Sequence, residues 1–266
     1  MILMNDFKAE PPELREAMLQ AVGRVLESGW YVLGNEVKHF EEQWSRVCGV
    51  SHGIGVGNGM DAIELALLGL SIGAGDEVIT TPMTAFATIL AIIRCGAKPV
   101  LADIDSETAL LSMESVKRCL SAKTKAVVLV HLYGQVRQMD EWVIMCGENK
   151  IMLIEDCAQA HQATWQGKVS GSFGQAGAYS FYPTKNLGAV GDAGMLVTSN
   201  STLAKKTRQL RNYGQSERYL HPVIGMNSRL DEVQAAMLSE RMNWLTEFTN
   251  RRRQIAAAYH SKLDNP

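Results

Sequence analysis

The chain has 266 residues, of which 46% are hydrophobic and 20% charged, and its formal net charge is −2. This composition is ordinary for a globular protein, and the length is ample for a buried core in one large or two small α/β domains. The charge balance gives no indication of nucleic acid or of a membrane surface as a partner, and no apolar run reaches the length of a membrane span.

Five scattered cysteines form no C-x-x-C pair and no spacing typical of a metal site. Unpaired thiols in odd number fit a reducing compartment and argue against a disulfide framework. The N-terminus is too short and too acidic to be a signal peptide. We therefore expect a cytoplasmic protein without a structural metal, and we expect Cys157 to be buried packing.

Short apolar runs rich in β-branched residues alternate with amphipathic stretches along the chain. The runs predict strands near 53–56, 77–81, 98–102, 126–131, 151–155, 177–181 and 194–198. The amphipathic stretches predict helices near 12–28, 35–48, 60–70, 85–95, 112–121, 139–148, 201–211 and 229–262. This alternation predicts a mostly parallel seven-stranded sheet with helices on both faces, in which ligands bind at the carboxyl ends of the strands.

A glycine-rich segment, residues 55–62, joins the first predicted strand to a helix. Glycines allow close backbone approach, and the free N–H groups of a helix start favour an anion such as phosphate. The alternative is a plain turn in which Asn58 or Asp61 caps the helix. The spacing gives neither a P-loop lysine motif nor the third glycine of the dinucleotide-binding fingerprint.

Three further strand ends carry residues with two interpretations each. Phe86, at a helix start, could stack on a planar ring or pack in the core. Asp103 and Asp105 could serve acid–base or metal chemistry, but turn or capping roles fit better because no other ligands cluster nearby. His131, at the end of a strand, could act directly in the chemistry, but a structural hydrogen-bonding role is expected.

An aspartate and a lysine at strand ends give the strongest chemical signal. Asp156 ends an apolar strand, where a carboxylate is costly without a partner, and Gln159 and His161 follow it. Lys185 lies in a turn five residues after Ser180. A lysine amine can form a Schiff base with pyridoxal phosphate, while an aspartate keeps the pyridine nitrogen protonated so that the ring accepts electrons.

The chain resembles the DegT-type pyridoxal-phosphate sugar aminotransferases, which belong to the aspartate aminotransferase-like superfamily and make amino sugars on nucleotide carriers. The matching blocks run in family order over nearly the whole chain. They lie at 28–34 (SGWYVLG), 57–62 (GNGMDA), 73–79 (GAGDEVI), 131–135 (HLYGQ), 155–161 (EDCAQAH), 180–188 (SFYPTKNLG) and 227–231 (NSRLD).

The resemblance implies the fold called type I and a homodimer. It implies that Lys185 is the catalytic base that carries pyridoxal 5'-phosphate and that Asp156 pairs with the pyridine nitrogen. The further implied cofactor contacts are ring stacking by Phe86, a bond from Gln159 to the ring hydroxyl, and phosphate binding by Ser180 and the backbone at Gly59, Met60 and Asp61. Asn227 would reach the phosphate of the neighbouring subunit, and Arg229 is a candidate for binding the carboxylate of the amino donor.

The chain departs from the family pattern at two places. Met60 stands where the family usually has a small hydroxyl residue, so a side-chain bond to the phosphate is lost. The family also extends roughly a hundred residues further. We therefore expect residues 1–246 to form the large cofactor-binding domain, with its N-terminal helical segment, and residues 247–266 to be the start of a truncated small domain.

The expected reaction moves an amino group from an amino acid, L-glutamate by resemblance, to a nucleotide-linked keto-deoxysugar. The alternative is a catalytically impaired or regulatory homologue that binds the cofactor but lacks the C-terminal domain. The related sugar dehydratases have histidine at the lysine position, so Lys185 argues against them. A nucleotide-dependent dehydrogenase lacks its glycine fingerprint here and gives Lys185 no role.

Overall fold

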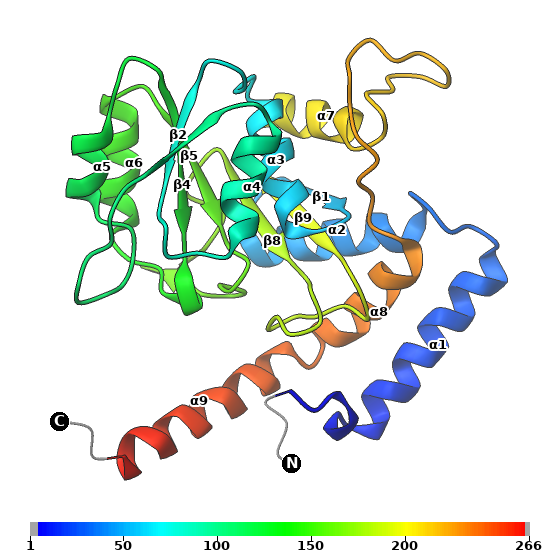
Figure 1. Ribbon diagram of the computed structural model, residues 1–266. Helices are drawn as coiled ribbons and strands as arrows, with labels where there is room; N and C mark the ends of the chain where they lie inside the picture. Colours follow the sequence, from blue (N-terminus) through cyan, green and yellow to red (C-terminus); the bar gives the residue numbers. More distant parts are fainter. Residues whose placement is uncertain (1–4, 264–266) are drawn as a thin grey trace.

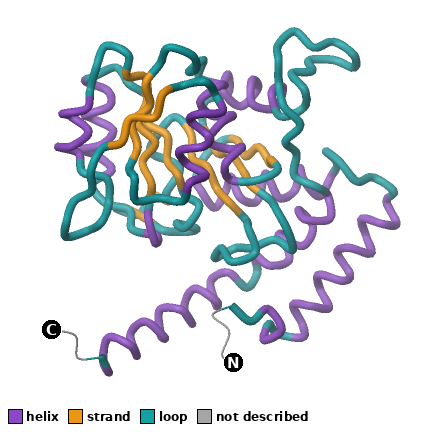
Figure 2. Tube along the Cα trace, in the orientation of Figure 1, coloured by secondary structure: helices purple, strands orange, loops and turns teal. Residues whose placement is uncertain are grey.

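The computed structural model describes residues 5–263 and contains one seven-stranded sheet with helices on both faces (Figures 1 and 2). The strands follow one another across the sheet in the order β1-β9-β8-β5-β4-β2-β3. Their bounds are β1 (His52–Val56), β2 (Glu77–Thr80), β3 (Lys98–Leu101), β4 (Thr124–Val130), β5 (Met152–Asp156), β8 (Ala176–Ser180) and β9 (Gly194–Thr198). Only β9 runs antiparallel to its neighbours, which confirms the predicted mostly parallel sheet.

The two faces of the sheet are buried in two separate clusters of apolar side chains. Along β4, Val127 and Leu129 enter one cluster while Ala126 and Val128 enter the other, as the twofold alternation of a strand requires. The first cluster is covered by α2 (Asn35–Cys48), α5 (Met113–Cys119), α6 (Met139–Glu148) and α8 (Glu232–Met242). The second is covered by α3 (Gly59–Gly69), α4 (Phe86–Arg94) and α7 (Ser201–Leu210).

A long helix, α1 (Pro12–Ser28), packs against α8 through Ala21, Val25 and Ala236 (Figure 1). A single buried carboxylate fixes the start of the next helix. Glu232 of α8 accepts hydrogen bonds of 2.8–3.0 Å from the amides of Gly34, Glu36 and Val37 at the N-terminus of α2. Because α2 has no side-chain cap of its own, Glu232 supplies the negative charge that a helix start favours.

Two predictions of secondary structure are wrong in detail. The single helix predicted over 229–262 is two helices, α8 and α9 (Leu245–Lys262), because Asn243 and Trp244 close tighter i→i−3 turns between them. A small hairpin of β6 (Thr164–Trp165) and β7 (Lys168–Val169) was not predicted. Two short 3₁₀ turns, Phe7–Ala9 and Leu132–Gly134, complete the described elements.

Leu245 is the one buried residue of α9 in the described chain, and the helix extends away from the sheet (Figure 1). Within residues 5–263, no helix is both long enough and apolar enough to cross a membrane.

Candidate active site

Lys185 lies half-buried on a closed loop that follows β8. The loop is held by two backbone hydrogen bonds, from the Lys185 amide to the Tyr182 carbonyl (2.8 Å) and from the Ala189 amide to the Phe181 carbonyl (2.7 Å). A Cβ atom at Gly188 would overlap the backbone of Pro183, so only glycine allows the loop to close. The lysine is therefore placed by local backbone geometry at the carboxyl edge of the sheet.

Asp156 is the last residue of β5, the strand beside β8, and only 6% of its surface is exposed. Its carboxylate accepts hydrogen bonds from the Thr88 hydroxyl (2.8 Å) and the Ala158 amide (3.1 Å). No cation pairs with it among residues 5–263. A buried carboxylate without a cation is costly, and a protonated ring nitrogen is a group that would remove this cost. Sequence reasoning missed Thr88.

The start of α3 lies against the end of β8, as an anion site at this edge would require. A Cβ atom on Gly59 would approach the Cβ of Ser180 to 2.7 Å, so glycine alone permits the contact. The Asn58 side chain caps the helix by accepting from the Asp61 amide (2.9 Å), which confirms the capping alternative for Asn58. The first amides of the helix, at Gly59 and Met60, have no intrahelical acceptor and are left for an anion.

Phe86 and Gln159 border the same edge of the sheet. The Phe86 side chain is 66% exposed at the start of α4, so the core-packing alternative is wrong. The Gln159 side-chain oxygen accepts from the Tyr133 amide (2.9 Å), and its NH2 group has no acceptor among residues 5–263. Gln159 and Lys185 line one cavity of about 490 Å³.

Asn227 is exposed on the segment between α7 and α8. It is bridged to Asn212, to which the Arg229 guanidinium donates a hydrogen bond (3.1 Å). Its neighbour Ser228 binds the glycine loop, accepting from the Gly57 amide (2.9 Å). Neither Asn227 nor Arg229 lines the cavity beside Lys185.

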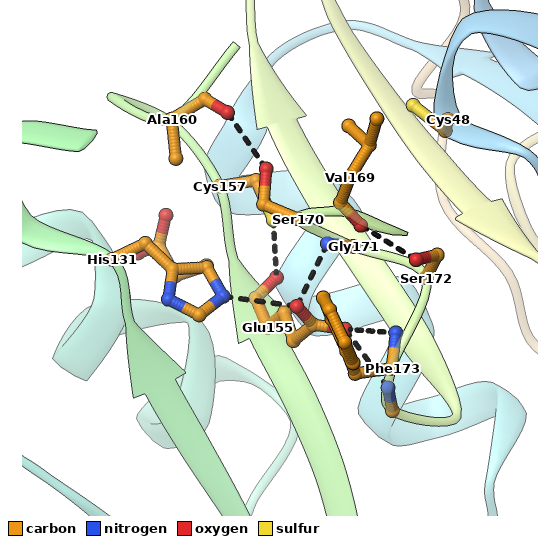
Figure 3. Close-up of polar contacts among 12 residues, drawn as sticks. Cys48, His131, Glu155, Cys157, Ala160, Val169, Ser170, Gly171, Ser172 and Phe173 are labelled. Atoms are coloured by element: carbon orange, nitrogen blue, oxygen red, sulfur yellow. Dashed lines mark hydrogen bonds and ion pairs between the residues drawn. The ribbon is translucent and has the colours of Figure 1, made fainter. Parts of the chain in front are cut away.

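Glu155, the residue before Asp156 on β5, is the centre of a buried hydrogen-bond cluster (Figure 3). Its carboxylate accepts from the His131 ring (2.9 Å) and from the amides of Gly171 (2.7 Å), Phe173 and Gly174 (both 2.8 Å). These bonds confirm the structural role expected for His131.

The ligand atoms of His131, Glu155 and Cys157 lie within 4.8 Å of one another. Backbone donors already occupy both oxygens of Glu155, so hydrogen bonding explains this cluster. Cys157 is fully buried, as expected, and burial raises the pKa of its thiol well above the ordinary value, which keeps it protonated and unreactive. Asp105 binds the amides of its own turn, which confirms the turn interpretation.

His161 lies between the Lys185 loop and the core. Its ring is 5.4–5.6 Å from the rings of Trp44, Tyr179 and Phe181, and neither ring nitrogen has a hydrogen-bond partner in the described chain. Burial first, and then the positive charge of Lys185, lower the pKa of His161 to about 3. The imidazole is therefore neutral at pH 7.

The residues at this edge fit a phosphorylated pyridine cofactor. Within residues 5–263, Asp156 has no cation partner and two helix amides beside Ser180 have no acceptor. The Phe86 ring is exposed, and a lysine lies on a closed loop at the same edge. Such a lysine and aspartate on a mostly parallel seven-stranded sheet define a fold type I, pyridoxal-phosphate-dependent transferase.

The chain belongs to the DegT/DnrJ/EryC1/StrS aminotransferase family, whose sequence model matches residues 12–265. It is 44% identical over 266 residues to the dTDP-3-amino-3,6-dideoxy-alpha-D-galactopyranose transaminase of Aneurinibacillus thermoaerophilus, covering 100% of this chain and 73% of that one. It is 43% identical over 261 residues to the pleiotropic regulatory protein of Geobacillus stearothermophilus, covering 98% of this chain and 70% of that one.

Solved structures agree with this assignment. The crystal structure of Streptomyces venezuelae DesV superposes with a TM-score of 0.93 at 43% identity, over 96% of this chain and 69% of that one. NtdA from Bacillus subtilis, crystallised with the bound cofactor PMP, superposes with a TM-score of 0.89 at 31% identity, over 95% of this chain and 58% of that one.

Proposed function

We propose that this protein transfers an amino group from an amino acid, L-glutamate, to a nucleotide-linked keto-deoxysugar, with pyridoxal 5'-phosphate as cofactor. The observation that carries the proposal is the buried Asp156 carboxylate, which lacks a cation in the described chain and lies one strand from the Lys185 loop. Relatives at similar identity are named as transaminases of dTDP- and UDP-linked sugars, which supports the acceptor class.

The cofactor, when bound, supplies an aldehyde for amino groups and a ring that accepts electrons. Asp156 would hold the ring nitrogen protonated, and Thr88 would orient that carboxylate through its 2.8 Å hydrogen bond. The remaining proposed contacts divide between the ring and the phosphate. Phe86 and Gln159 would contact the ring, and Ser180 with the backbone of Gly59, Met60 and Asp61 would hold the phosphate.

Lys185 performs the proton transfers in this proposal. Lys185 would hold the cofactor until the amino donor displaces it; its Nζ would then move a proton from the donor Cα to the cofactor and, in the second half of the reaction, from the cofactor to the sugar carbon. It must be neutral to accept a proton, so it cannot be held in an ion pair. No carboxylate lies within ion-pair distance of it among residues 5–263, which supports the role.

We further propose a cytoplasmic homodimer in which Asn227 of the partner subunit completes the phosphate site. The exposure of Asn227, and its absence from the lining of the cavity beside Lys185, support a role at another copy. Residues 1–246 would be the large cofactor-binding domain and residues 247–266 the start of a small one. The sparse burial of α9 supports that boundary.

A regulatory, cofactor-binding role is the second candidate, because the Geobacillus stearothermophilus relative is named as a regulatory protein. The two functions make different demands on Lys185. An aminotransferase needs the lysine for turnover with an amino donor, whereas a regulator needs at most the bound cofactor.

Visible absorption of the purified chain with pyridoxal phosphate, before and after L-glutamate, tests the proposal. The matched controls are Lys185→Ala and Lys168→Ala, the second being an exposed lysine on β7. A visible band that needs Lys185 and disappears with L-glutamate is the expected result. A Lys185-dependent band that no amino donor changes would favour the regulatory role, and absence of any band would refute cofactor binding.

A further inference from the structure

The cavity beside Lys185 has one wall that the proposed cofactor contacts do not use. This wall is the first half of α9, which contributes Thr249, Arg252, Arg253 and Ala256. The opposite wall carries Gln159, His161 and the Lys185 loop with Asn186. The two arginines therefore face the space in which an amino group must approach Lys185.

The cavity is strongly positive. Its lining contains Lys185, Arg252 and Arg253, and no acidic side chain of the described chain lines it. Among residues 5–263, neither arginine makes an ion pair or a hydrogen bond through its guanidinium. Their neighbour Arg241, by contrast, is paired with Glu10.

Arg252, unlike Arg253, also lines a second cavity together with Lys185. Its positive charge adds to that of Lys185 in lowering the pKa of the buried His161, behind the dominant effect of burial. The Arg252 side chain is exposed on α9, and local desolvation, followed by the positive charge of Arg241, lowers its pKa. A carboxylate bound beside Arg252 would counteract both the desolvation and the repulsion from Arg241, because an anion beside a guanidinium favours its charged form.

The ligand that fits is the α-carboxylate of the amino donor. This group is attached to the same carbon whose proton Lys185 removes, so it must lie within a few bond lengths of Nζ. A guanidinium presents a fork of donors that matches a carboxylate in two parallel hydrogen bonds. A keto-sugar carries no carboxylate at its reacting carbon, so this contact would serve the donor half of the reaction alone.

We propose that Arg252, on α9, binds the α-carboxylate of the amino donor in the cavity beside Lys185; this assignment rests on the proposed function. It differs from the expectation for Arg229, which in this chain binds Asn212 and stacks over Tyr213, its guanidinium carbon 5.3 Å from the ring centroid. Arg253 provides a second positive charge at the same wall.

Calorimetric binding of glutarate to the purified chain is the first test. Glutarate has the carboxylates of a dicarboxylic donor but no amine, so its binding does not depend on turnover. Arg252→Gln is expected to weaken glutarate binding by about 10- to 100-fold, as loss of a charge-assisted hydrogen-bond pair predicts. Arg252→Lys keeps the charge but not the fork, and an intermediate affinity is expected.

Lys262→Gln is the matched control, because Lys262 is an exposed cation on the same helix that lines neither this cavity nor the second cavity beside Lys185. It is expected to bind glutarate within about twofold of the parent chain. Thermal unfolding of each variant checks that the fold is retained. Equal affinities for the parent, Arg252→Gln and Lys262→Gln, or no glutarate binding by the parent, would overturn the proposal.

The rate at which L-glutamate removes the Lys185-dependent visible band separates the two proposals. If L-glutamate removes the band of the parent, and removes that of Arg252→Gln slowly although the band forms normally, both the proposed function and the role of Arg252 are supported. A variant that reacts as fast as the parent refutes the role of Arg252 and leaves the aminotransferase intact. A parent whose band does not respond refutes the proposed function, and glutarate binding then still decides whether Arg252 holds a carboxylate.

Discussion

Replacement of Glu155 by glutamine is expected to destabilise the fold without changing its shape. Glutamine has nearly the same volume but only one acceptor oxygen, and its NH2 group is a donor. In the protein, one Glu155 oxygen faces the amides of Phe173 and Gly174, and the other faces the Gly171 amide and the His131 ring. At least one backbone N–H must therefore face the new NH2 group.

The better orientation of the glutamine keeps its oxygen toward Phe173 and Gly174 and turns its NH2 group toward Gly171 and His131. The Gly171 amide is then buried without an acceptor, which costs about 1–3 kcal/mol, and the retained bonds lose charge assistance. We expect the free energy of unfolding to fall by about 2–4 kcal/mol.

Urea unfolding at pH 7, followed by circular dichroism, measures this change. Glu148→Gln, at an exposed position at the end of α6, is the matched control and is expected within about 0.5 kcal/mol of the parent. If Glu155→Gln were as stable as Glu148→Gln, the four hydrogen bonds would not hold the 170–174 turn, and the reasoning would be refuted.

Three further predictions concern Gly188, Asp156 and His161. Gly188→Ala places a Cβ atom against the Pro183 backbone and should lower the free energy of unfolding, measured with urea, by about 1–3 kcal/mol. Gly147→Ala is the control, because its Cβ atom meets nothing within 4 Å. An equal loss of stability in both variants would contradict the argument. Asp156→Asn should leave the cofactor-free stability within about 1 kcal/mol but reduce amino transfer, assayed with L-glutamate, at least about 100-fold; retained transfer would exclude a charged role. The folded-state pKa of His161 is lowered to about 3 from 6.5, so the unfolded chain binds the extra proton between these values and stability is lost as pH falls through them. Between pH 7 and 4.5 the free energy of unfolding of the parent should therefore fall by roughly 2–3 kcal/mol more than that of His161→Phe. Equal falls would show that His161 takes up its proton in the folded protein.

The strands were predictable because each is a short apolar run bounded by turn residues, and a strand buried on both faces needs no distant information to be recognised. The β6–β7 hairpin escaped because two-residue strands have no periodicity. Its signal was the Gln166-Gly167 pair, both with positive φ (49° and 81°), as a tight hairpin turn requires. The break between α8 and α9 was not predicted, because a single asparagine, Asn243, is a weak signal within an otherwise helical pattern.

At the candidate site, the sequence located residues whose position follows from the end of a strand, such as Asp156, Ser180 and Lys185. It could not find residues whose role depends on which way a distant helix faces. Thr88 reaches Asp156 only because α4 begins beside the end of β5, and Arg252 lines the cavity only because α9 lies beside the Lys185 loop. Both depend on packing that no local pattern encodes.

The order of strands across the sheet also affects how the chain folds during translation. β1 lies at the edge of the sheet and pairs with β9 alone, so a nascent chain carries β1 without its partner for roughly ten seconds of synthesis. In the finished fold, Glu41 of α2 accepts from the Gly55 amide (2.7 Å) and Arg211 donates to the Gly55 carbonyl (2.6 Å). Glu41 and Arg211 therefore occupy the Gly55 amide and carbonyl of this edge strand in the finished fold, so that a strand of another chain cannot pair with them.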